Sequence, residues 1–189
     1  MDDRLTAEEK QILLRLARSA LERSVRGDEL PGVDPESLTP HLREPGASFV
    51  TLTIRGDLRG CIGALEPSLP LAEDVRDHAV AAALEDPRFM PVTPEEVENI
   101  ELEVSRLTLP RDLEYTDARD LLEKLRPGVD GVILRDGSRR ATFLPQVWEK
   151  IPDKAGFLDH LCAKMGAPPD AWRQRHLHVQ TYEVEEFHE

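Results

Sequence analysis

The sequence has few cysteines and no long apolar run. Cys61 and Cys162 are its only two cysteines in 189 residues. No stretch approaches the roughly 18 consecutive apolar residues of a membrane-spanning helix, and no basic and apolar signal segment opens the chain. These absences predict a cytoplasmic protein without membrane contact. In a reducing compartment the two distant cysteines are expected to be free thiols.

Basic residues are scarce relative to acidic ones. The sequence has 24 lysines and arginines against 37 aspartates and glutamates, which gives a net charge of -13. A surface of that sign repels nucleic-acid phosphates, so direct nucleic-acid binding is not expected. Arginines within residues 15–26 could form a local basic patch along one helix, but their acidic neighbours favour a solvated helix face.

The common motifs for cofactors and metals are missing as well. The sequence has no glycine-rich phosphate loop, no serine elbow and no dinucleotide-binding fingerprint. His176 and His178 would share one face of a strand, but a structural or catalytic zinc site needs three or four ligands. We therefore expect neither a metal site nor a cofactor.

The composition that is present is that of a folded globular protein. Hydrophobic residues make up 40% of the chain and charged residues 32%, which suits a real core under a well-solvated surface. A chain of 189 residues is within the usual size of one domain. We therefore predict a single domain over residues 1–189.

Apolar periodicity predicts helices and strands in a definite order. Thr6 and Glu9 form a capping box ahead of a helical pattern that ends at Gly27. Alternating residues on either side of Gly56 and Gly137 predict two β-hairpins. The other predicted elements are helices over 70–85, 93–96, 118–125, 145–150 and 155–165, and strands over 100–105 and 177–181.

The order of hairpin, helix and strand occurs twice along the chain. The turns at Gly56 and Gly137 mark the two occurrences. This repetition suggests an internal duplication, although the two halves share little residue identity. It predicts an α+β fold in which two related hairpin, helix and strand units share one mixed sheet, with helices packed around it.

Cys61 is the strongest candidate for chemistry. It is a nucleophilic residue type, lies between Gly60 and Gly63, and is two residues from Arg59 on the same predicted strand face. An arginine in that place favours a thiolate, whereas glycines in a strand indicate a bulge or a close approach to the backbone. The competing interpretation is that Cys61 is a small, buried, apolar side chain.

A cysteine nucleophile usually works with a base. The sequence offers several histidines for that role and singles out none of them: His78, His160, His176 and His178. Glu103 is another candidate base, since Glu103 and Ser105 lie on the strand face opposite the apolar residues. That face could equally be a solvated surface. Arg88 could bind a carboxylate or simply pair with Asp86.

Several motifs together resemble one known family. The run Leu58-Arg59-Gly60-Cys61-Ile62-Gly63 is similar to the signature of the AMMECR-type domain family, component A of the AmmeMemoRadiSam gene system. Further runs of the family occur in the same order across nearly the whole chain: Glu85-Asp86-Pro87-Arg88-Phe89, Glu103-Val104-Ser105, Arg126-Pro127-Gly128-Val129-Asp130-Gly131 and Thr142-Phe143-Leu144-Pro145-Gln146-Val147-Trp148.

The resemblance implies a fold, partners and a site. It implies two related hairpin and helix units sharing a curved sheet, and a modification pathway with a Memo-type protein and a radical S-adenosylmethionine enzyme as partners. Added to the strand-face argument, its signature favours Cys61 as nucleophile or thiol carrier, with Arg59 as charge stabiliser or anion clamp and Glu103 as a candidate base. The reaction and the small-molecule or protein substrate are not fixed by it. The alternative is a non-catalytic binding or scaffold module for the same partners.

Overall fold

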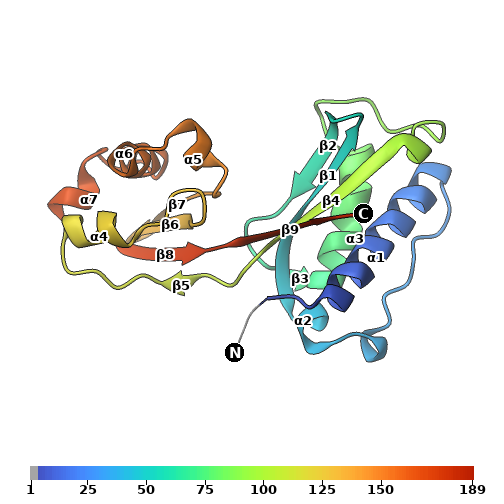
Figure 1. The fold of residues 1–189 in the computed structure, drawn as a ribbon, viewed down its shortest axis with the longest axis horizontal. Helices are drawn as coiled ribbons and strands as arrows, with labels where there is room; N and C mark the ends of the chain where they lie inside the picture. Colours follow the sequence, from blue (N-terminus) through green and yellow to red (C-terminus); the bar gives the residue numbers. More distant parts are fainter. Residues whose placement is uncertain (1–3) are drawn as a thin grey trace. The chain divides into compact units, whose positions relative to one another are not determined.

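The structure is a computed structural model that describes residues 4–189, and it confirms the α+β class (Figure 1). The chain divides into two compact units. Unit 1 holds the residues up to Thr108 together with Glu185–Glu189, and unit 2 holds Leu109–Val184. Each unit has its own hydrophobic core and its own antiparallel sheet. The strands therefore form two sheets, where one curved mixed sheet was expected.

The first helix of unit 1 begins and ends where the sequence predicted. Helix α1 (Ala7–Arg26) starts with a capping box between Thr6 and Glu9. Gly27 follows in the left-handed conformation with φ of 74°, and its N–H donates to the carbonyls at the helix end. Glycine suits this position because it adopts positive φ without steric cost.

The sheet of unit 1 has the strand order β2-β1-β4-β9, with β3 beside β1. Its strands are β1 (Pro45–Ile54), β2 (Asp57–Gly63), β3 (Leu69–Pro70), β4 (Ile100–Leu107) and β9 (Val184–His188). Helices α1 and α3 (Leu71–Leu84) pack against each other and against one face of this sheet (Figure 1). Val50, Leu52 and Leu102 point into that core. Side chains alternate between the two faces of a strand, so the residues next to these three on β1 and β4 have their side chains on the opposite face.

The sheet of unit 2 has the strand order β5-β8-β6-β7. Its strands are β5 (Arg111–Asp112), β6 (Gly131–Asp136), β7 (Arg139–Phe143) and β8 (His178–Tyr182). The helices of this unit are α4 (Ala118–Lys124), α5 (Val147–Lys150), α6 (Lys154–Lys164) and α7 (Ala171–Gln174). Trp148 stacks on Phe157 in the core, with ring centroids 3.6 Å apart.

Three segments differ from the prediction. Strand β9 was missed, because the last residues of the chain are largely acidic and do not alternate cleanly between apolar and polar. The helix expected from residue 93 is only a turn followed by the 3-10 helix η2 (Val97–Asn99). The crossing between α1 and β1 contains the short helices η1 (Pro35–Ser37) and α2 (Pro40–Arg43).

The structure also bears on the two expectations that the cysteines are free thiols and that the chain has no membrane-spanning helix. Cys61 and Cys162 are free thiols, as predicted, and Cys162 is fully buried in unit 2. Among residues 4–189, none of the helices has the length and apolar character required to cross a membrane.

Candidate functional site

Cys61 lies on β2 at the edge of the unit 1 sheet and is partly exposed. In the antiparallel pairing of β1 and β2 it is opposite Thr51, whose hydroxyl lies 3.3 Å from the Cys61 sulfur. Thr51 is in turn opposite Glu103 on β4. Cys61, Thr51 and Glu103 thus form a cross-strand row on the sheet face away from the helices.

The backbone of Cys61 is held by the Asp-Pro-Arg segment that follows α3. Its N–H donates to Asp86 Oδ2 at 2.8 Å, and its carbonyl accepts from Arg88 Nη2 at 3.1 Å. Among the strands of residues 4–189, no further one pairs with this side of β2, and these two hydrogen bonds take the place of strand pairing. Asp86 and Arg88, with their contacts to the backbone of Cys61, are called the edge clamp. Since both backbone groups of Cys61 point away from β1, its pair with Thr51 is of the non-hydrogen-bonded kind, in which side chains approach closely.

Asp86 and Arg88 also bind each other. Arg88 Nε lies 2.9 Å from Asp86 Oδ1, and Nη2 lies 2.6 Å from Oδ2. Asp86 is buried, and the hydrogen bonds from Arg88 hold the pKa of its carboxyl well below the usual range, helped by the N–H of Cys61. The clamp therefore presents an ionised carboxylate and a cation beside Cys61 across the neutral pH range.

Within the described part of the chain, the side chain of Arg59 makes its hydrogen bonds to the segment before β4 and none to Cys61. The register of β1 and β2 shifts between Leu52 and Thr53, which leaves Arg59 without an opposite residue and interrupts the alternation used to predict its face. Its Nε and Nη2 donate to Glu96 at 2.7 and 3.0 Å, and Nη1 donates to the carbonyl of Met90 at 2.9 Å. The hydrogen bonds from Arg59 lower the pKa of Glu96 to about 2. Arg59 thus fastens the loop before β4 to strand β2.

The glycines beside Cys61 serve close packing within the protein. A Cβ atom on Gly60 would overlap the carbonyl oxygen of Ala82 in α3, and one on Gly63 would overlap the ring of Phe49. The predicted close approach to the backbone at these positions is therefore made by the protein itself.

Glu103 and Ser105 have different surroundings on β4. Burial raises the pKa of the Glu103 carboxyl, and repulsion from Glu186 acts in the same direction, while His188 opposes them. Ser105 is buried opposite Phe49. Glu103 is thus the carboxylate of this face whose environment suits a proton acceptor.

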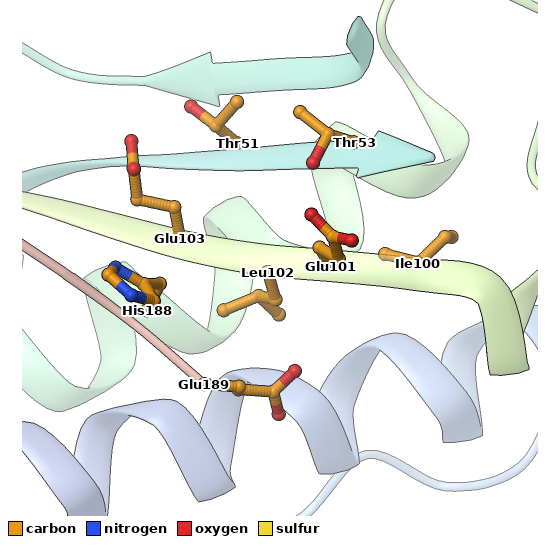
Figure 2. Close-up of a pocket in the computed structure, with 8 residues that line it drawn as sticks. All are labelled: Thr51, Thr53, Ile100, Glu101, Leu102, Glu103, His188 and Glu189. Atoms are coloured by element: carbon orange, nitrogen blue, oxygen red, sulfur yellow. The ribbon is translucent and has the colours of Figure 1, made fainter. Parts of the chain in front are cut away.

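A pocket of about 310 Å³ opens on the sheet face that carries the cross-strand row (Figure 2). Its polar lining comes from three strands: Thr51 and Thr53 on β1, Glu101 and Glu103 on β4, and His188 with Glu189 at the end of β9. Ile100 and Leu102 complete it. The presence of the last two residues of the chain in this pocket was not predicted, because strand β9 was not expected.

The candidate histidines each have a partner of their own. In unit 1, His78 Nδ1 lies 3.2 Å from Asp74 Oδ2, and that buried carboxylate also accepts from Ser48. The other three belong to unit 2. His160 contacts the carbonyl of Gly156, His178 contacts Asp112, and His176 stacks on Tyr115. None of these contacts involves Cys61, so they do not select one of the four histidines as its base.

Residues 4–189 contain no group of three or more histidine, cysteine, aspartate or glutamate side chains arranged to hold a metal ion.

The chain is similar to known proteins over nearly its whole length. The model of the AMMECR1 family matches residues 14–187. A protein of Methanothermobacter thermautotrophicus is 40% identical over 190 residues, which cover 98% of this chain and 96% of that protein. Protein MJ0810 of Methanocaldococcus jannaschii is 38% identical over 192 residues, covering 98% of this chain and 92% of MJ0810. The crystal structure of the uncharacterized protein PH0010 from Pyrococcus horikoshii has a TM-score of 0.75 and 36% identity, covering 98% of this chain and 93% of that one.

Proposed function

The chain belongs to the AMMECR1 family, and on that premise we propose that it is component A of an AmmeMemoRadiSam system whose working group is the thiol of Cys61. In this proposal the protein acts in the cytoplasm as a cysteine-dependent enzyme or enzyme component of a modification pathway. Its partners are a Memo-type protein and a radical S-adenosylmethionine enzyme.

The observation that carries the proposal is the cross-strand row. Thr51 places a hydroxyl 3.3 Å from the Cys61 sulfur, where it can donate a hydrogen bond to a thiolate. Glu103, the next member of the row, has a raised carboxyl pKa, which suits a group that accepts and returns a proton. A nucleophile, a hydroxyl donor and a carboxylate thus lie side by side on three adjacent strands.

These groups suit a transfer reaction. In the proposed step the Cys61 sulfur forms a bond to an electrophilic carbon of the substrate, and the thiol proton passes to the Thr51 hydroxyl, whose own proton moves on to Glu103 in the same row. The leaving group departs with the electron pair of its bond to that carbon, and it takes a proton back from Glu103. Arg88, which contacts the Cys61 carbonyl, supplies positive charge beside the sulfur, and Arg59 supports the strand through Glu96.

A specific observation favours the alternative of a non-catalytic binding module. Leu58 and Met90 are large apolar side chains with 43% and 81% of their surface exposed, and both lie near Arg59. Exposed apolar groups of this kind often contact a partner. However, the edge clamp occupies the backbone of Cys61, so a partner strand cannot add to β2 at that residue without displacing Asp86 and Arg88.

Alkylation of the folded protein with iodoacetamide separates the two functions. At pH 7 we expect Cys61 to be modified faster than a small model thiol, and Cys162 to be modified only after unfolding, because Cys162 is fully buried and burial raises its pKa. Mass spectrometry of tryptic peptides measures both rates in one sample. Modification of Cys61 at the rate of the model thiol or slower, or only after unfolding, would rule out the nucleophile and leave the binding module.

A further inference from the structure

The pocket on the unit 1 sheet carries a second carboxylate, that of Glu101, which the proposed thiol chemistry does not use. We propose that this pocket binds a small organic cation, whose primary ammonium or guanidinium group is held between Glu101 and Glu103. The binding would not depend on Cys61 acting as a nucleophile. It therefore adds a ligand class to the site.

The size of the pocket sets the size of its ligand. A volume of about 310 Å³ is at the lower end of the range of small-molecule sites. The pocket is lined along two neighbouring strands by the paired positions Thr51 with Glu103 and Thr53 with Glu101. Each carboxylate thus has a hydroxyl opposite it. A ligand of about the size of an amino acid side chain fits this arrangement.

The charges of the lining residues select a cation. Glu189 is paired with Arg18 of α1, so its charge is already offset. Within the described residues 4–189, Glu101 and Glu103 have no ion-pair or hydrogen-bond partner for their carboxylates. They lie two residues apart on one face of β4, roughly 7 Å from each other along the strand. A cation between them would reach both carboxylates.

The raised pKa of the Glu103 carboxyl also favours cation binding. This pKa is raised because burial and the charge of Glu186 disfavour the ionised form, and the only opposing contribution is that of His188. A bound cation would relieve the same repulsion. An organic cation fits better than a metal ion, because the described residues supply no cluster of three metal ligands.

The position of the pocket relates the cation to the thiol. Thr51 lines the pocket and also contacts the Cys61 sulfur. Adjacent strands are about 4.8 Å apart, so a cation held at β4 would lie roughly 10 Å from the edge strand that carries Cys61. A substrate with a cationic group at one end and an electrophilic carbon at the other would span that distance.

Nuclear magnetic resonance titration of the full chain tests the proposal. The probes are pentylamine, pentylguanidine and the neutral pentanol, at constant ionic strength and pH 7, where the two amine-derived probes are charged. We expect saturable shifts of the Thr51, Glu101 and Glu103 amides with one or both cations, and none with pentanol. Whichever cation binds more tightly identifies the preferred group. Equal shifts with pentanol, or shifts spread over the acidic surface without saturation, would overturn the proposal.

Matched variants distinguish binding in the pocket from general attraction of a cation to the acidic surface. Glu101→Gln should raise the dissociation constant of the bound cation about fivefold, the size expected for one solvent-exposed ion pair. Glu98→Gln removes an exposed carboxylate outside the pocket and should leave it unchanged. Equal weakening by both variants would show non-specific attraction. Cys61→Ser should also bind as before, so loss of thiol chemistry and loss of cation binding are read separately.

Discussion

The hairpin of β1 and β2 in unit 1 and the hairpin of β6 and β7 in unit 2 occupy the same place in two sheets of matching topology. In each sheet the second hairpin strand is the edge, the first lies inside it, and a later strand pairs antiparallel with the first. Counting from the two turns, the cross-strand row of unit 1 corresponds to Thr142, Ile133 and Gln180 of unit 2. Unit 2 therefore has the framework of the row without its thiol or carboxylate.

The edge clamp, by contrast, is partly shared. The carbonyl of Cys61 accepts from Arg88, and the carbonyl of the corresponding Thr142 accepts from Lys164 at 2.9 Å. A cation from a segment after the hairpin therefore closes the edge strand in both units. Only unit 1 adds a buried carboxylate, Asp86, that also takes the backbone N–H. The cation at the edge is thus part of the architecture, whereas the row is what distinguishes unit 1.

The largest difference between the two hairpins is expected in the free energy of unfolding when one edge-strand residue is substituted in each. The two positions are Gly60 in β2 and Ala141, which holds the corresponding place in β7. Gly60→Ala should lower the free energy of unfolding by about 3 kcal/mol, because its Cβ would overlap backbone of α3. The reverse change, Ala141→Gly, should cost only about 1 kcal/mol. Urea unfolding measures both. Equal losses would mean that the two edge strands are packed alike.

The acid response of the two clamps should differ by a smaller amount. An aspartate with a lowered pKa in the folded state stabilises the protein above its unfolded pKa of about 4, and this stability is lost as the pH falls through the folded pKa. Asp86 should therefore make unit 1 less stable as the pH falls below about 4. The clamp of unit 2 joins Lys164 to a backbone carbonyl and contains no carboxylate.

Asp86→Asn tests this origin of the acid response. The variant should be less stable than the parent at pH 6 but should lose less further stability on acidification, because the titrating group is gone. Amide hydrogen exchange at β2, with β7 of the same samples as the internal reference, measures it. An unchanged acid dependence of β2 exchange would assign the response to other carboxylates, such as Glu96.

Local patterns in the sequence predicted the elements better than the connections between them. The capping box of α1, both hairpin turns and the outward face of Thr51 and Glu103 follow from spacing within a few residues. The clamp on Cys61 joins residues 25 and 27 positions apart, and Arg59 meets Glu96 at a separation of 37. Periodicity carries no information about such contacts.

Because periodicity carries no information about contacts between distant residues, it also could not predict the full lining of the pocket or the division of the strands into two sheets. Strand β9 contributes His188, yet its acidic sequence resembles a solvated tail, so this wall of the pocket could not be predicted. The repeated order of hairpin, helix and strand correctly indicated two related units. It could not indicate whether their strands pair with each other, because each hairpin satisfies its own backbone hydrogen bonds locally.

The central claim is that the row tunes the thiol of Cys61, and its most direct test is the iodoacetamide rate of Cys61 at pH 7 in two matched variants. Thr51→Val removes the hydroxyl that contacts the sulfur, whereas Thr53→Val makes the same change two residues along the strand. We expect Thr51→Val to slow alkylation about tenfold, as for loss of a hydrogen bond to a charged group, and Thr53→Val to leave the rate unchanged. Equal rates in both variants and the parent would contradict the account.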